Sequence, residues 1–262
     1  PPWALSPLIE FGHRVVAIAA GPLILVAALS GLRLPGLPRW VRVLPWWALI
    51  GAAAAAAFGR RVVLDHLPAW LGAVDLACAL TALTAITVAA AVVGRVVNDR
   101  PLARDARATV RRSAAAGLVT LLVLHVTGIL VAGPGSFTAT VGWPMWRVLD
   151  SDHHGWLQVV RVAATAVILV LAGVTAAAAA KAGGDRSRVR LGAFTMLVLC
   201  AAELVLGLVI RATGLDRATA AAYAVLAVAV FWSFACLVAA GVPSQGAAER
   251  SDGRPREVVA AA

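Results

Sequence analysis

Seven apolar stretches of about twenty residues occupy most of the chain, and they limit its fold more than any other feature. They cover residues 8–31, 43–59, 69–94, 113–133, 156–180, 191–210 and 218–241. A helix of roughly 20 apolar residues crosses the ~30 Å hydrocarbon core of a bilayer. Only 14% of the residues are charged, against about 25% in a soluble domain, which leaves too little charge for a water-facing surface. The sequence therefore predicts an all-α polytopic membrane protein with seven transmembrane helices.

The lysines and arginines between these stretches predict an orientation. Seven of them fall on one side of the membrane and sixteen on the other. The sixteen are Arg33, Arg39, Arg42, Arg95, Arg100, Arg104, Arg107, Arg111, Arg112, Lys181, Arg186, Arg188, Arg190, Arg250, Arg254 and Arg256. Because cytoplasmic loops carry an excess of such residues, this side is predicted to be cytoplasmic. We expect a multi-pass protein of the cell (plasma) membrane, with a cytoplasmic C-terminus and residues 10–13 at the extracytoplasmic end. The net charge of +10 is then a topology signal, and nucleic acid is not an expected partner.

The chain resembles itself at an offset of 148 residues. Residues 8–14 align with residues 156–162, and Leu67 with its following Ala-rich stretch aligns with Leu215. Internal repeats of this kind indicate a duplicated architecture. The fourth apolar stretch then opens the second repeat, and its counterpart in the first repeat is missing. We interpret the seven helices as a 3+4 remnant of two tandem four-helix bundles.

This interpretation divides the chain into three parts. Residues 1–112 form an N-terminal half with three transmembrane helices, which lacks the first helix of the repeat. Residues 113–242 form a C-terminal four-helix bundle. Residues 243–262 are polar and are predicted to be a disordered cytoplasmic tail.

Glu10 and His13 are the first candidates for chemistry, because ionisable groups inside membrane spans are costly and need an explanation. Their i, i+3 spacing places them on one helical face, and Arg14 follows directly. A neutral imidazole that faces a bundle interior can serve as an axial ligand of haem iron. A carboxylate one turn away could orient that ring or accept a proton. The structural alternative is an interfacial Glu/Arg cap with a hydrogen-bonded histidine.

Other polar residues within or near the spans offer further candidates. Asp75 and His13 belong to different helices of the same half and could face each other, while Asp75 could equally be a neutral buried acid. At the 148-residue offset the counterpart of Asp75 is Tyr223. His125, alone on an apolar helix, is interpreted as a packed and hydrogen-bonded histidine. His154 precedes a helix and could reach a ligand.

The chain resembles the haem A synthases, the cytochrome oxidase assembly proteins that convert haem O to haem A. The resemblance rests on IEFGHRVVA at the start of a helix, on LPAWLGAVDLACAL and on the glycine-rich VAGPG after the fourth stretch. It covers most of residues 7–240 and agrees with the doubled four-helix architecture.

The resemblance implies a set of functional residues. In that family each half carries two haem-ligating histidines, on its second and fourth helices. One half binds haem b as cofactor and the other half binds haem O as substrate. By position Glu10 matches the glutamate implicated in oxidising a haem methyl group, and His13 matches the first iron ligand. Asp75 stands where the second histidine is expected.

The second half departs from the family pattern. Arg161 and Tyr223 occupy both of its histidine positions, and Gln158 stands opposite Glu10. Tyrosine can ligate haem iron, whereas arginine is permanently charged and normally cannot. His154, two helical turns before Arg161, is the alternative ligand in this half.

The sequence leaves three functions open. The first is a haem A synthase-like oxidoreductase whose expected partners are membrane lipid, haem, and haem O synthase or oxidase assembly factors. The second is a non-catalytic relative that handles haem or assists oxidase assembly. The third is a small-molecule transporter in which Asp75 and the intramembrane Glu203 relay protons.

Overall fold

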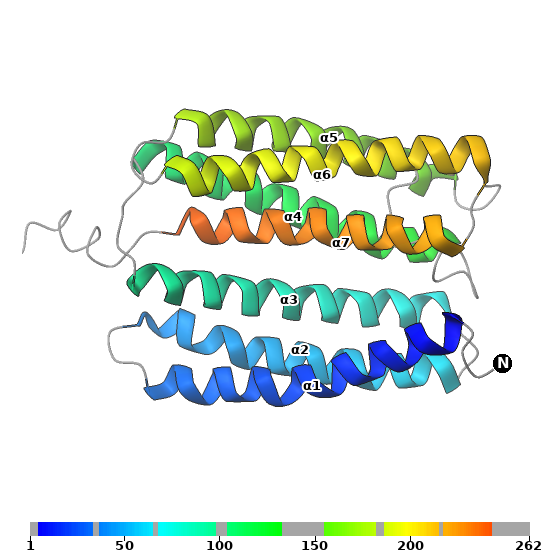
Figure 1. The fold of residues 1–262 in the computed structure, drawn as a ribbon, viewed down its shortest axis with the longest axis horizontal. Helices are drawn as coiled ribbons and strands as arrows, with labels where there is room; N and C mark the ends of the chain where they lie inside the picture. Colours follow the sequence, from blue (N-terminus) through cyan, green and yellow to red (C-terminus); the bar gives the residue numbers. More distant parts are fainter. Residues whose placement is uncertain are drawn as a thin grey trace, which may run out of the picture.

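The computed structural model describes residues 5–33, 37–64, 68–97, 104–132, 155–181, 186–214 and 217–242. Within these residues the chain forms seven α-helices (Figure 1). They are α1 (Leu5–Arg33), α2 (Arg39–Leu64), α3 (Ala69–Val97), α4 (Arg104–Ala132), α5 (Gly155–Lys181), α6 (Arg186–Thr213) and α7 (Arg217–Ala240). Each is long and apolar enough to cross a membrane. The prediction of an all-α polytopic membrane protein with seven transmembrane helices is confirmed.

Proline and glycine mark several helix ends. Pro38 and Pro68 directly precede α2 and α3, where their fixed φ angle suits a helix start. Gly214 follows α6 with a φ of +88° and donates its backbone N–H to the carbonyl of Ile210 at 2.8 Å. This is the left-handed cap that glycine adopts without strain. Pro22 and Pro45 lie inside α1 and α2, a placement that membrane helices tolerate.

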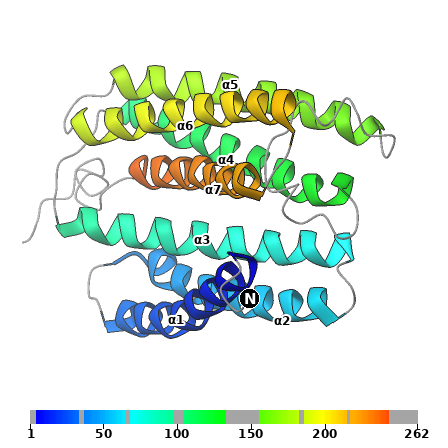
Figure 2. The same ribbon diagram turned by 45° about the vertical axis from the view of Figure 1, so that its right-hand side comes forward.

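The helices form one closed bundle and one open layer. In the C-terminal half α4 packs against α5, α5 against α6, α6 against α7, and α7 back against α4. In the N-terminal half α1 packs against α2 and α2 against α3. Figures 1 and 2 show α3 lying between the two halves, where it packs against α4 and α7. The Trp232 indole on α7 also donates a hydrogen bond to the Thr87 hydroxyl on α3 at 3.1 Å.

The helix bounds follow the internal repeat. Shifted by 148 residues, α1 would span 153–181 and α2 would span 187–212, close to the bounds of α5 and α6. Shifted in the same way, α3 would begin at 217, which is the first residue of α7. Within the described residues the first set of helices contains no counterpart of α4. The observed packing thus agrees with a 3+4 arrangement, while the division at residues 112 and 242 stays a prediction.

Within the described residues, positions buried in the C-terminal bundle are more exposed at their counterparts in the N-terminal half. In the C-terminal half Thr175 is fully buried and donates a hydrogen bond to Ser113 on α4 at 2.8 Å. Its counterpart in α1, Ala27, is only partly buried. Likewise Ala227 on α7 is fully buried, whereas its counterpart Ala79 on α3 is exposed.

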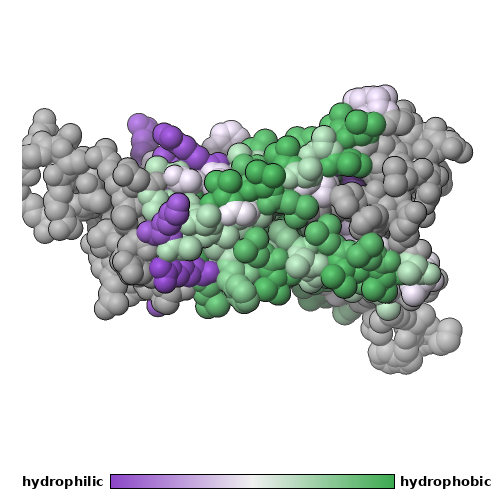
Figure 3. Space-filling model, turned by 90° about the horizontal axis from the view of Figure 1, so that it is seen from above, coloured by the Kyte–Doolittle hydropathy of each residue, from purple (hydrophilic) through white to green (hydrophobic). Residues whose placement is uncertain are grey.

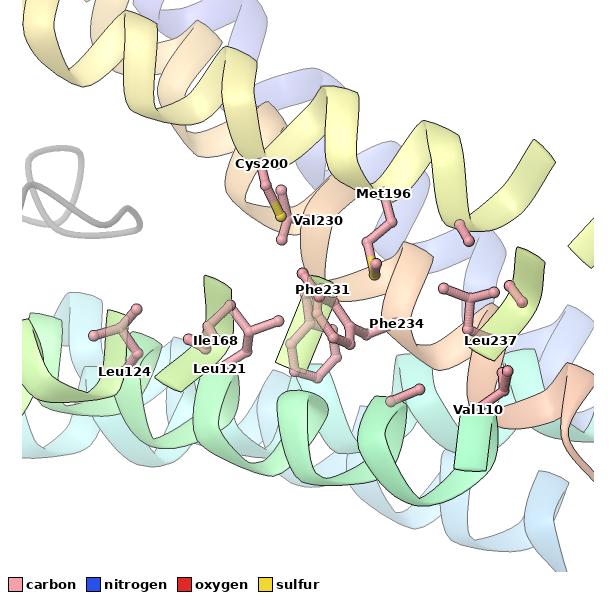
Figure 4. Close-up of a cluster of buried hydrophobic side chains, with 14 of the residues drawn as sticks. Val110, Leu121, Leu124, Ile168, Met196, Cys200, Val230, Phe231, Phe234 and Leu237 are labelled. Atoms are coloured by element: carbon pink, nitrogen blue, oxygen red, sulfur yellow. The ribbon is translucent and has the colours of Figure 1, made fainter. Parts of the chain in front are cut away.

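The main hydrophobic core lies inside the closed bundle (Figure 4). Phe231 and Phe234 of α7 project from the bundle centre toward α4, and Met196 of α6 packs above them. Gly117 on α4 makes room for one of these rings. A Cβ at that position would lie only 2.3 Å from the Cε1 atom of Phe234. The interior is therefore filled by side chains at this depth.

Candidate functional site

The residues that carry the haem prediction lie partly outside the described structure. Glu10, His13 and Arg14 belong to α1, but their side chains are outside its described part. His154 lies in residues 133–154, which are also outside the described residues. The ligand role of His13 and the alternative role of His154 therefore stay predictions. The helical backbone of α1 agrees with a separation of one turn between Glu10 and His13.

Asp75 lies in the second turn of α3, and its carboxylate lies against α2. A Cβ at Gly59 of α2 would be 3.3 Å from the Oδ2 atom of Asp75. The missing side chain at Gly59 thus leaves room for this partly buried carboxyl group between the two helices. Whether Asp75 also meets His13 depends on a side chain outside the described part. Asp75 offers a carboxylate oxygen as a ligand atom at the position where the resemblance expects an imidazole nitrogen.

The C-terminal half holds a buried cluster of polar side chains, Arg161, His125 and Tyr223. Arg161 on α5 is 4% exposed, and its Nη1 atom donates hydrogen bonds to the carbonyl of Leu124 and to the Thr127 hydroxyl on α4. Both His125 and Tyr223 lie close enough to interact electrostatically with its guanidinium. Arg161 and Tyr223, which stand at the two positions that the resemblance assigns to histidines, thus lie close together inside one bundle. Arg161 is also hydrogen-bonded to α4.

His125 is packed tightly inside this cluster. Its Nδ1 atom lies 2.6 Å from the carbonyl of Leu121, so Nδ1 carries the proton and donates the bond. The ring meets Phe231 edge-on, with centroids 5.9 Å apart and an interplanar angle of 75°. Its Nε2 atom is buried, makes no hydrogen bond to any described residue, and lies next to the backbone of Ala227. The interpretation of His125 as a packed, hydrogen-bonded histidine agrees with this geometry.

Glu203 is a further buried ionisable residue of the C-terminal half. It lies on α6, is 0% exposed, and is one turn away from the buried Cys200. At about 1.5 Å per residue it is roughly 15 Å from the end of α6, whereas Arg161 and Tyr223 are roughly 9 Å from the ends of their helices. Glu203 therefore lies farther from the end of its helix than Arg161 and Tyr223 lie from the ends of theirs.

The described residues of the C-terminal half do not fit a haem. Arginine cannot release a proton and offer a lone pair to iron, and Arg161 already donates hydrogen bonds to α4. Leu121, Ile168, Phe231 and Phe234 fill the adjacent space, each at most 1% exposed. No three His, Cys, Asp or Glu side chains come together as a metal site in the part of the chain that the structure describes.

Sequence reasoning named Arg161 and Tyr223 but not the partners of Arg161. Thr127 and Leu124 are 34 and 37 residues away along the chain. Nothing in an apolar helix marks one backbone carbonyl as an acceptor for a distant arginine. The sequence feature that could have suggested a partner for Arg161 is the polar Thr127, two residues after His125 on the same helix.

Comparison of this chain with protein-family models, with curated proteins and with solved structures found no match.

Proposed function

We propose that this chain is a haem A synthase-like membrane oxidoreductase, which converts haem O to haem A for cytochrome oxidase assembly. The proposal begins from the motif around Glu10 and His13. One structural observation supports it most: three helices recur at an offset of 148 residues, beside a closed four-helix bundle. This is the duplicated architecture that the resemblance implies.

The N-terminal half would carry the chemistry. His13 would hold the haem iron from α1, and Arg14 is suited to pair with a haem propionate. Haem O held there would be the substrate, and oxidation of its methyl group to a formyl group would take the oxygen atom from water and pass the electrons to another membrane carrier. Glu10, one turn before His13, would accept a proton from the substrate. Asp75 of α3 would line the same site, with its carboxylate next to Gly59 of α2.

Substitution of the iron ligand should prevent the N-terminal half from binding haem. We expect His13→Ala to abolish haem retention, because His13 matches the first iron ligand and Asp75 stands where the second histidine is expected. We expect Glu10→Gln to retain haem but to stop haem A formation. Optical spectra and haem stoichiometry of the purified protein measure the first effect. Haem extracted from cells that co-express a haem O synthase measures the second effect.

His154→Ala is the matched control for this experiment. It should leave haem content unchanged, because His154 is required only if the ligand set lies in the C-terminal half. Normal haem content in His13→Ala together with loss in His154→Ala would contradict the assignment of the site.

A second candidate function is a non-catalytic relative that handles haem or assists oxidase assembly. The hydrogen bonds of Arg161 favour it, because the family's reaction uses one haem in each half and this half does not fit one. Haem bound by the wild-type protein without any haem A formation, when haem O is supplied, would identify this function. Haem O synthase and oxidase assembly factors remain the proposed partners in either case.

We further propose that the protein lies in the plasma membrane with a cytoplasmic C-terminus. The three native cysteines lie inside helices α3, α6 and α7. An Asp105→Cys variant at the start of α4 should therefore resist membrane-impermeant thiol reagents in intact cells and react after permeabilisation. Arg60→Cys, at the exposed opposite end, should react without permeabilisation. The reverse pattern would invert the proposed topology.

A further inference from the structure

One end of the bundle carries a dense set of cations (Figure 3). It is the end where α1 and α5 finish and where α2, α4 and α6 begin. The described cations there are Arg33, Arg39, Arg42, Arg107, Arg111, Arg112, Lys181, Arg188 and Arg190. The two carboxylates with described side chains, Asp75 and Glu203, lie toward the other end. Over the whole sequence this side has sixteen cations and six carboxylates, so its charge is strongly positive.

Two corners at this end repeat each other. Arg33 in the last turn of α1 and Arg42 in the first turn of α2 form the first corner. At the 148-residue offset their counterparts are Lys181 in the last turn of α5 and Arg190 near the start of α6. The internal repeat thus conserves a pair of cations where one helix ends and the next begins. A surface that is only positive overall would not need cations at matching positions of the two repeats.

Arg190 is fixed at the second corner. Its Nη2 atom donates a hydrogen bond to the carbonyl of Ala180 at 2.7 Å. This carbonyl belongs to the last turn of α5, whose partial negative charge favours a cation. The bond holds the guanidinium at the end of α5, where Lys181 directly follows Ala180. Two cations on adjacent helices therefore lie at the same corner of the bundle.

The Nε atom of Arg42 at the first corner has no acceptor among the described residues. The side chain is partly buried, and its Nε atom is buried without a hydrogen-bond partner among the described residues. An unsatisfied guanidinium N–H is unfavourable, and a phosphate oxygen is among its strongest acceptors. Phosphate at this corner would supply the acceptor once the flexible side chain turns toward it. Trp40, exposed two residues earlier, is an aromatic side chain typical of the headgroup level.

We propose that these two corners bind the phosphate groups of anionic phospholipids, one lipid between α1 and α2 and one between α5 and α6. Arginine forks recognise phosphate bidentately, and the acyl chains of such a lipid would lie along the apolar outer surfaces of the same helices. The exposed apolar side chains Leu29 and Leu32 of α1 and Leu191 and Phe194 of α6 provide that surface. The protein then contacts both the headgroup and the acyl chains of the lipid. A soluble anion has no acyl chains and would make only the first of these contacts.

Native mass spectrometry of the purified full chain tests this proposal, with phosphatidylglycerol titrated against phosphatidylcholine in detergent. We expect the wild type to retain two phosphatidylglycerol molecules. Arg33→Gln/Arg42→Gln should weaken one of them, and Lys181→Gln/Arg190→Gln should weaken the other, each by about 30-fold at low salt. Combining all four substitutions should remove both bound lipids. Arg42→Lys and Arg190→Lys keep the charge and should lose only part of the binding.

Matched controls separate two defined sites from a diffuse positive surface. Arg112→Gln removes one exposed cation at the same end of the bundle, and Arg60→Gln/Arg61→Gln removes two at the opposite end. Neither control should change the number of retained lipids. The proposal fails if Arg112→Gln weakens binding as much as Arg33→Gln/Arg42→Gln does, or if phosphatidylcholine is retained equally well. Displacement of phosphatidylglycerol by millimolar inorganic phosphate would also overturn it, because the site would then serve a soluble anion.

Discussion

Arg161→Ala will destabilise the C-terminal bundle by at least about 3 kcal/mol, since hydrogen bonds from a charged donor contribute roughly 1.5–3 kcal/mol each and two are lost. Both bonds join α5 to α4, through the carbonyl of Leu124 and the hydroxyl of Thr127. The side chain is also buried, so its removal leaves a cavity. For a chain of this size the unfolding midpoint should fall by roughly 6–12 °C. Thermal unfolding of the purified protein in one detergent measures this shift.

Two further variants show whether the hydrogen bonds cause the effect. Arg188→Ala removes an exposed arginine and should change stability by less than about 0.5 kcal/mol. Arg161→Met keeps most of the volume and should recover part of the loss, because Thr127 still donates its hydroxyl to the carbonyl of Val123. If Arg161→Ala unfolds within 1 °C of the wild type, Arg161 does not hold α4 and α5 together.

Gly117→Ala should destabilise the same bundle by about 1–3 kcal/mol, the usual effect of overpacking a filled core. The new Cβ would lie 2.3 Å from Cε1 and 2.7 Å from Cδ1 of Phe234. This ring is 0% exposed and surrounded by core side chains, so it has little room to move aside. Unfolding midpoints in detergent report the change.

The control for this second prediction is Gly173→Ala on α5, where a Cβ would meet nothing within 4 Å. That substitution should stabilise the chain slightly, because alanine is the better helix former by up to about 1 kcal/mol. The double variant Gly117→Ala/Phe234→Leu should be less destabilised than the sum of its two single variants. Simple additivity would show that the two residues do not compete for the same space.

The sequence predicts the helices of this protein well, because the membrane leaves few alternatives. A stretch such as 69–94 has to satisfy its backbone hydrogen bonds internally, and a helix does so without any partner. The 148-residue offset adds the pairing of α1, α2 and α3 with α5, α6 and α7. These properties depend on periodicity and length, which are visible along the chain.

The side-chain contacts of the candidate site could not be predicted in the same way. The acceptors of Arg161 lie on a different helix, and their positions depend on how α4 rotates against α5. The bond from Trp232 to Thr87 joins residues 145 positions apart. Similarly, nothing in the composition of α4 indicates that Gly117 receives an aromatic ring. Helix rotation is set by packing in three dimensions, so the sequence pattern alone leaves it open.

The packing of α1 has a thermodynamic consequence. Among the described residues α1 packs extensively only against α2, and many of its apolar side chains are exposed, including Phe11, Ile18 and Leu23. It is therefore the helix whose detachment disturbs the fewest neighbours, and in lipid it would leave as an intact helix rather than unwind. Any molecule that bridges α1 and α3 would make that detachment harder. Ligand occupancy and the anchoring of α1 would then rise and fall together, because a ligand stabilises the state that it binds.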